Sequence, residues 1–314
     1  MLQFRATVLS AVAVAALAMV VPVQAGKLAI VIDDFGYRPH QENQVLALPN
    51  TVSVAVLPNA PHAREMATKA HSGGHEVLIH LPMAPLSKQP LEKDTLRPDM
   101  SSAEVERIIR DAVSKVPYAV GLNNHMGSAM TSSLFGMQKV MQALSHYNLY
   151  FLDSVTIGNT QAMRAAAGTG VKVIKRKVFL DDTQNEADIR VQFNRAVQLA
   201  RRNGSAIAIG HPHPTTVRVL QQMVYNLPPD ITLVRPSSLL NEPQVDTSTP
   251  NGAGPATAQP QKPRNPFSGV KLCRAKKGVE PVYASRYFEI LGDSIRHSTL
   301  VQYMTLQWQG WGNK

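Results

Sequence analysis

Short apolar runs alternate with longer helix-like segments from about residue 27 to residue 240. Such nearly continuous apolar strands between helices are typical of parallel strands covered on both faces. The pattern therefore predicts an α/β fold. Its candidate strands are Leu28–Ile32, Thr51–Val56, Val77–Leu81, Ala119–Leu122, Tyr150–Leu152, Val171–Ile174, Ala206–Ile209 and Ile231–Val234.

The segments between these runs carry helical stripes. In residues 101–116 the apolar residues Val105, Ile108, Ile109 and Ala112 recur at helical spacing, and Ser101 or Ser102 can cap the helix. Residues 131–147 and 186–202 follow the same pattern, and Thr183 precedes Glu186 at capping-box spacing. Seven or eight strand–helix units suit a (β/α) barrel better than an open sheet.

The two ends of the chain differ from this region. Residues 1–25 combine Arg5, an apolar stretch and the small residues Val23 and Ala25, which predicts a cleavable signal peptide and a periplasmic protein. An uncleaved membrane anchor is the alternative, but Pro22 and the small residues favour cleavage. We therefore expect a folded domain over residues 26–242, a linker rich in Pro, Thr and Ala over 243–268, and a small basic tail over 269–314.

The cysteine count and the net charge limit the kinds of binding partner that the sequence predicts. Cys273 is the single cysteine, so no internal disulfide can form, and we assign this thiol no role. The net charge is +10, with an excess of basic residues in the tail. This tail can contact an anionic envelope surface or remain solvated. An exported protein rarely meets nucleic acid, so we expect no nucleic-acid partner.

Asp and His residues gather where the predicted strands end. Because parallel strands present their carboxyl ends at one edge, these side chains can converge. Asp, His and His are also the ligand types of a hydrolytic zinc site with an open position for water. The candidates are Asp33, Asp34, His80, Asn123, Asn124, His125, Asp153, Ser154, His211 and His213.

Other features have simpler interpretations. Asp181 and Asp182 precede Thr183 and are read as part of a turn and helix cap. The basic run KVIKRKV could bind an anionic substrate, but a solvated edge is the simpler explanation. The chain has no Gly-x-Ser-x-Gly elbow, P-loop or HExxH, so serine-hydrolase chemistry is not expected.

Five short motifs in order resemble a known family. IVIDDFGY, HLPM, NNHMGS, FLDS and GHPHP resemble the divergent branch of the polysaccharide deacetylase superfamily, the NodB-like fold. The resemblance covers about residues 27–240. It implies a distorted (β/α)7 barrel and metal-dependent removal of acetyl groups from sugars.

The resemblance also implies unequal roles for the site residues. Asp33 maps to the general base, Asp34 and His80 to metal ligands, and His211 or His213 to the general acid. The superfamily's second histidine ligand falls on Ala84, and its arginine motif is missing. His125 could supply the missing imidazole.

The remaining candidates support this chemistry. Asp153 could hold the acidic imidazole in the right tautomer, and Asn124 and Ser154 are candidate substrate-binding residues. The resemblance implies a divalent metal ion, and one carboxylate with two imidazoles favours Zn²⁺. Such an ion lowers the pKa of the water bound to it and polarises the carbonyl of the substrate's acetamide.

We therefore expect an exported hydrolase that deacetylates envelope amino-sugars, with an acetylated polysaccharide or peptidoglycan fragment as substrate. The alternative is an inactive carbohydrate-binding or envelope-assembly protein on the same scaffold. Asp33 and Asp34 can face one site only if the chain leaves strand geometry there, and Gly36 makes such a turn plausible.

Overall fold

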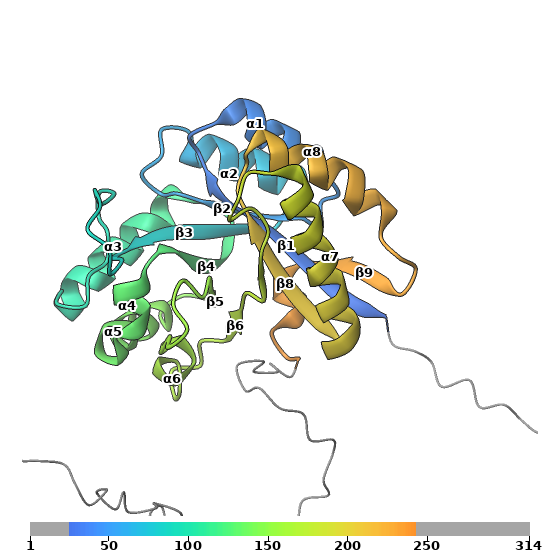
Figure 1. Cartoon of the computed structure of the whole chain (residues 1–314). Coiled ribbons are helices and arrows are strands. Elements are labelled where there is room, and N and C mark those ends of the chain that lie inside the picture. The colour runs from blue at the N-terminus through green and yellow to red at the C-terminus, as the bar shows by residue number, and fades with distance from the viewer. Residues whose placement is uncertain (1–24, 243–314) are drawn as a thin grey trace, which may run out of the picture. The chain divides into compact units, whose positions relative to one another are not determined.

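A computed structural model describes residues 25–242, and within them a single parallel sheet is surrounded by helices (Figure 1). The predicted signal peptide, linker and tail lie outside these residues, apart from Ala25. No helix in the described part of the chain has the length and apolar character needed to cross a bilayer.

All eight predicted strands are present, most within two residues of their expected bounds. A ninth, β7, was not predicted, because two residues give no periodicity. The strands are β1 Gly26–Phe35, β2 Ser53–Val56, β3 Val77–Met83, β4 Ala119–Met126, β5 Tyr150–Asp153, β6 Val173–Lys175, β7 Val178–Phe179, β8 Ser205–Gly210 and β9 Ile231–Val234.

The sheet forms a half-barrel. Its order is β6-β5-β4-β3-β2-β1-β8-β7, while β9 pairs with β1 beside β2, and all of these pairings are parallel. Within the described residues β6 and β7 form no pair, so the barrel is open there. The expected distorted NodB-like arrangement is confirmed.

The helices cover the outer face of the half-barrel. Ser101 caps α3 as predicted, since its side chain accepts a hydrogen bond from the Glu104 N–H. The expected Thr183 cap is wrong: Asn185 caps α7 by accepting from Ala187 N–H, and Thr183 donates to Asp188 instead. The helices are α1 Pro39–Val45, α2 Ala63–Ser72, α3 Ser102–Lys115, α4 Ser128–Ser132, α5 Leu134–Leu144, α6 Ala162–Ala165, α7 Glu186–Asn203 and α8 Pro214–Met223, with short 3-10 turns η1 Val224–Asn226 and η2 Pro236–Leu239.

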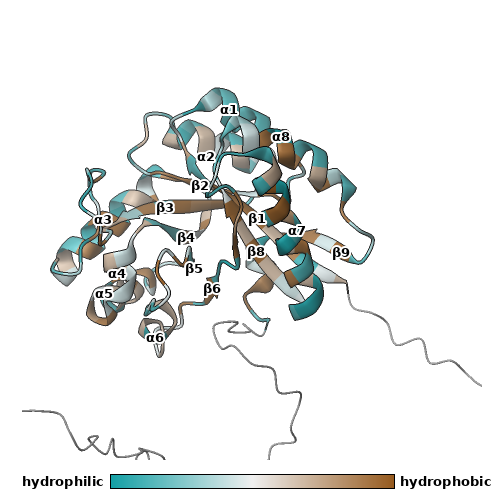
Figure 2. Cartoon of the chain, in the orientation of Figure 1, coloured by the Kyte–Doolittle hydropathy of each residue, from teal (hydrophilic) through white to brown (hydrophobic). Residues whose placement is uncertain are grey.

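Two apolar layers follow from strand alternation, and β1 and β3 carry long brown, hydrophobic stretches in Figure 2. Leu28, Ile30 and Ile32 of β1 pack outward with residues of the helices. Ala29 and Val31 face inward, toward the interior of the half-barrel. Residues of the same parity at the carboxyl ends of the strands therefore point into the open end of the half-barrel.

Candidate active site

The end of β1 departs from strand geometry, as expected. Ile32 and Phe35 both pack in the outer layer, although they are three positions apart, and the register with β2 shifts between them. Asp34 is the extra residue and adopts a left-handed conformation with φ 59°. The bulge lets Asp34 join Asp33 on one side of the strand end, where regular alternation would separate them.

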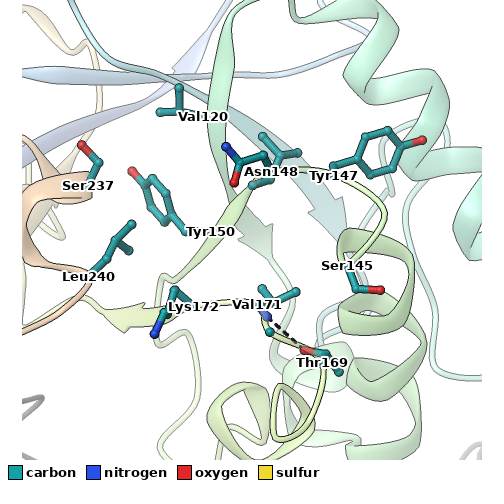
Figure 3. Close-up of a pocket in the computed structure, with 12 residues that line it drawn as sticks. Val120, Ser145, Tyr147, Asn148, Tyr150, Thr169, Val171, Lys172, Ser237 and Leu240 are labelled. Carbon is teal, nitrogen blue, oxygen red and sulfur yellow. Dashed lines mark hydrogen bonds between the residues drawn. The ribbon is translucent and has the colours of Figure 1, made fainter.

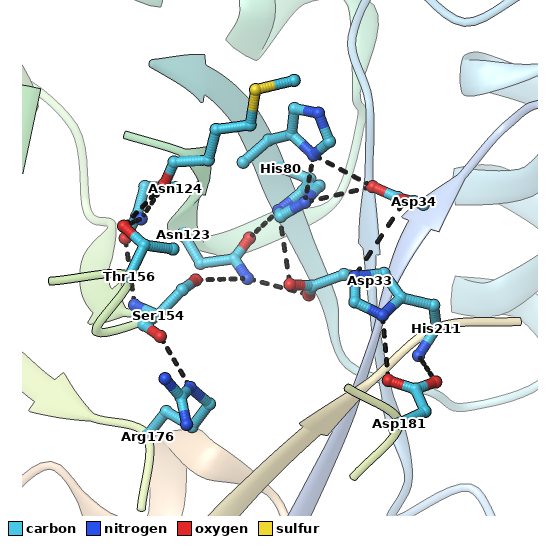
Figure 4. A network of polar contacts seen from close by, with 12 residues as sticks. Asp33, Asp34, His80, Asn123, Asn124, Ser154, Thr156, Arg176, Asp181 and His211 are labelled. Atoms are coloured by element: carbon cyan, nitrogen blue, oxygen red, sulfur yellow. Dashed lines mark hydrogen bonds and ion pairs between the residues drawn. The ribbon is translucent and has the colours of Figure 1, made fainter. Parts of the chain in front are cut away.

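Asp34, His80 and His125 come together at this end of the half-barrel (Figure 4). Asp34 Oδ1 lies 3.3 Å from His80 Nε2 and 3.1 Å from His125 Nδ1. The two ring nitrogens are 3.1 Å apart. Burial raises the pKa of Asp34, but the imidazoles of His125 and His80 outweigh it and hold that pKa well below its usual range.

This donor set fits a divalent metal ion. Asp34 Oδ1 is buried and has no hydrogen-bond partner among the described residues. A buried carboxylate oxygen without such a partner is costly in free energy, and a bound cation would offset that cost. Ligands about 2.0–2.1 Å from a tetrahedral ion lie about 3.3 Å from one another. The three separations in this cluster are close to that value.

The cluster contains two imidazoles even though Ala84 stands where a second histidine was expected. It is buried after the end of β3, and its backbone N–H donates to Leu96 O. His125 comes from the neighbouring strand β4, where it pairs in register with Pro82 of β3. The side chain of His125 thus reaches the place beside Asp34.

Asn123 joins Asp33 to His80. Its side-chain N–H donates to Asp33 Oδ1 at 2.8 Å, so its own oxygen faces His80 Nδ1, also at 2.8 Å. That oxygen can only accept, so His80 carries a hydrogen on Nδ1 and turns Nε2 toward Asp34. Burial raises the pKa of Asp33, although His80, His211 and Asn123 oppose the shift.

His211 stands on the other side of Asp34. Its Nε2 lies 4.0 Å from Asp34 Oδ2, and its Nδ1 is 3.0 Å from Asp181 Oδ1. Burial lowers the pKa of His211, but Asp181 outweighs this and raises it to about 9. The ring is therefore protonated at neutral pH.

His213 is placed less favourably than His211. Its Nδ1 lies 3.3 Å from an Arg38 guanidinium nitrogen and its Nε2 3.4 Å from Gln184. Burial lowers the pKa of His213. Of the two candidate acids, only His211 combines a carboxylate partner with an approach to Asp34.

The predicted role of Asp153 is not supported. Asp153 accepts hydrogen bonds from Val155 N–H and Thr160, and no histidine contact is found for it among residues 25–242. The physical reason is alternation, because Leu152 faces the interior and the next residue faces outward. Asp181, interpreted from sequence as part of a helix cap, occupies the place beside His211.

Asn124 and Ser154 are also structural rather than exposed to a ligand. They are 1% and 2% exposed. Asn124 donates to Met126 O and accepts from Ser154 N–H, so its polar atoms join two strand ends. The prediction that these two residues bind substrate is not supported.

Asp181 and Asn123 are the polar residues of the site that lacked a predicted role. Asp181 is held by three donors: the His211 N–H, the His211 ring and the Thr216 hydroxyl. Both residues share the inward parity of their strands, since Phe179 packs against the inner layer and Gly121 lies against the ring of Tyr150. That parity was the available signal.

A buried carboxylate shapes the turn after Asp34. Glu42 is 0% exposed, and its Oε1 accepts from the backbone N–H groups of Gly36, Tyr37 and Arg38 at 2.9, 3.0 and 2.6 Å. Gly36 has φ 113°, and a Cβ there would lie 2.6 Å from the Ala60 Cβ. Two features therefore fix the turn that carries Tyr37 and Arg38 to the rim of the site: the carboxylate of Glu42 and the backbone conformation of Gly36.

Replacing Glu42 with alanine should lower the free energy of unfolding by about 2–3 kcal/mol, because three backbone donors lose their acceptor. Urea unfolding followed by circular dichroism measures this change. Gln44→Ala, an exposed change in the same helix, is the control and should shift stability by no more than about 0.5 kcal/mol. Equal stabilities of Glu42→Ala and wild type would show that the turn does not depend on this carboxylate.

The site opens to solvent through a cleft of about 160 Å³, lined by Tyr37, Arg38, Glu92, His125 and His211 among others. A larger cavity of about 380 Å³ lies at the opposite ends of the strands, around Tyr150 and Lys172 (Figure 3). Its titratable lining residues are two tyrosines and Lys172, and the Tyr150 hydroxyl already donates to Glu76. The smaller cleft therefore holds the chemistry.

Comparisons with known proteins show which family the chain belongs to. Residues 30–240 match the model of the divergent polysaccharide deacetylase family. The chain is 77% identical over 314 residues to the uncharacterized protein YibQ of Escherichia coli (strain K12), covering 100% of this chain and 97% of that protein. It is 45% identical over 219 residues to an uncharacterized protein of Haemophilus influenzae, covering 70% and 78% of the two chains.

Among solved structures, the uncharacterized protein ATU2773 from Agrobacterium tumefaciens C58 superposes with a TM-score of 0.64 at 20% identity, over 69% of this chain and 89% of that one. This similarity concerns the fold. The family match covers the half-barrel and every residue of the cluster around Asp34. The chain therefore belongs to the divergent polysaccharide deacetylase family.

Proposed function

We propose that the protein is a divalent-metal-dependent hydrolase that removes acetyl groups from amino-sugars of the cell envelope. The observation that carries the proposal is the orphaned, buried Oδ1 of Asp34 beside two imidazole nitrogens. We infer from the sequence of residues 1–25 that the protein is exported to the periplasm, where such glycans lie.

Asp34, His80 and His125 would hold the ion, and Zn²⁺ suits one carboxylate and two imidazoles. When bound there, it would supply Lewis-acid polarisation of the acetyl carbonyl and acidify water. Asn123 supports this assignment because it fixes the His80 tautomer that leaves Nε2 as the ligand atom.

Asp33 would act as the general base. It lies beside the cluster, its Oδ2 3.6 Å from His80 Nδ1, and Asn123 holds its Oδ1. The raised pKa of Asp33, a consequence of burial, brings the carboxylate closer to the operating pH of a base. Its task is to take the proton of the attacking water.

His211 would act as the general acid. The imidazolium form is stabilised by Asp181, and its Nε2 is directed toward Asp34 across the cleft. From there it can give its proton to the departing amine of the sugar, and Asp181 keeps the ring oriented during the transfer.

The competing function is carbohydrate binding without catalysis. The missing arginine motif favours this alternative, whereas His125 supplies an imidazole beside Asp34 despite Ala84. The alternative predicts that the protein binds acetylated glycans and releases no acetate.

Acetate release separates the two functions. Purified protein lacking residues 1–25 and loaded with zinc should release acetate from N-acetylated chito-oligosaccharides or peptidoglycan fragments, and a chelator should stop the release. An enzyme-coupled acetate assay measures the rate. No release over this panel by a protein that retains zinc would favour the binding role.

A further inference from the structure

A basic hollow adjoins the active site on the side of β5 to β7. It encloses about 500 Å³ and is lined by Thr156, Arg176, Lys177, Phe179, Asp182 and Arg195, among others. Arg176 and Lys177 belong to the basic run of residues 172–178 that the chemistry above does not use.

The hollow directly adjoins the residues of the proposed active site. The ring of Phe179 lies 5.2 Å from the ring of His211, centroid to centroid. On the other flank, Thr156 donates to the carbonyl of Met126, the residue after His125. A glycan whose acetylated unit lies against His125 and His211 can therefore extend into this hollow with its neighbouring unit.

Arg176 is held rigidly at the base of the hollow. Its Nε donates to Ser154 O at 2.6 Å (Figure 4). One Nη donates to Val155 O at 2.7 Å, and the guanidinium carbon lies 5.0 Å from the centre of the Phe179 ring. A guanidinium fixed in this way loses little entropy when it also binds an anion. This rigidity argues against a merely solvated edge.

Arg195 brings a second positive charge from another element, α7. Burial lowers the pKa of Arg176, the carboxylates of Asp153 and Asp33 oppose this, and the charge of Arg195 lowers it further. Both guanidinium groups line the same hollow. Among the lining residues, Asp182 is the single carboxylate.

We propose that this hollow binds an anionic group, a carboxylate or a phosphate, on the sugar next to the acetylated one. Arginine pairs favour such groups because their N–H donors match the oxygens of both. The inference rests on the proposed function, since it names acidic glycans as the substrate class of the same site.

The experiment measures binding without turnover, by calorimetry in an Asp33→Asn background. The probes are three N-acetylated oligosaccharides of equal length: a neutral one, one with a hexuronate unit and one with a phosphorylated unit. We expect at least one acidic probe to bind about five- to tenfold tighter than the neutral probe at low salt, with the difference shrinking at high salt.

Arg195→Glu should remove this preference, measured as the ratio of the affinities for the acidic and neutral probes. Arg202→Glu, an exposed change of equal charge on the same helix, is the matched control and should keep the preference. The hexuronate and phosphate arms decide which anion is bound.

Equal affinities for all three probes, or a preference that survives Arg195→Glu, would overturn the inference. This failure is separable from failure of the proposed function. Acetate release without a preference for acidic probes would support the hydrolase and overturn only the anion-binding hollow. A preference for acidic probes without acetate release would support the hollow as part of a carbohydrate-binding protein.

Discussion

Replacing Asp34 with alanine should abolish tight zinc binding and, with it, acetate release. Asp34 supplies the one carboxylate of the cluster, and its Oδ1 lies within 3.3 Å of both ligating imidazole nitrogens. Without it, two neutral imidazoles remain, and they provide neither the charge nor the third ligand that a hydrolytic zinc site needs. We expect the zinc affinity to fall by more than about 100-fold, since even changes behind the ligands cost 10–100-fold.

Competition with a chromogenic chelator measures this affinity. Asp99→Ala removes an exposed carboxylate outside the cluster and should leave zinc binding unchanged. Asp34→Ala protein that still holds one tight zinc ion would place the ion elsewhere and remove the basis of the proposed mechanism.

Replacing Asp33 with asparagine should reduce kcat for acetate release by about 10²–10⁴ while zinc stays bound, because a general base contributes in that range. The structure gives the two carboxylates different surroundings. Asp33 is buried and held by Asn123, whereas Asp34 carries the orphaned oxygen toward the imidazoles. Asparagine preserves the shape of the side chain but cannot take a proton.

Two measurements on the same preparation check this prediction, the zinc content and the rate of acetate release. Asp99→Asn, an exposed change outside the cluster, serves as a control for the loss of a carboxylate. An Asp33→Asn enzyme with the wild-type rate would assign the base to another group. Loss of zinc would make Asp33 a ligand, contrary to the division of roles proposed here.

The strands, the helices and most of the cluster around Asp34 could be predicted from the sequence, because they depend on periodicity and on the rule that parallel strands end at one edge. The errors over Asp153 and Asp181 have one physical origin. Strand alternation was not followed past the apolar run of each strand, and alternation separates Asp153, which faces outward, from Ser154, which faces inward.

The same rule accounts for the position of His211 and for that of Asp181, whose role was missed. In β8, Ile207 and Ile209 face inward, so His211 does too. Phe179 packs against the inner layer, and Asp181 follows it with the same parity. The existence of β7, two residues long, was beyond the sequence pattern.

Other features depend on contacts between distant segments. Glu42 holds three backbone N–H groups of the turn after Asp34, and nothing in its own helix marks it as different from an ordinary surface glutamate. The ion pair of His211 with Asp181 joins residues 30 positions apart. Periodicity has no information about such pairs.

The position of zinc in a crystal of the protein, found from its anomalous scattering, tests the central claim most directly. The account predicts one strong peak about 2.0–2.2 Å from Asp34, His80 Nε2 and His125 Nδ1. A peak instead between Asp181, His211 and His213, the other group of ligand-type side chains in the described residues, would contradict it, as would no peak at all.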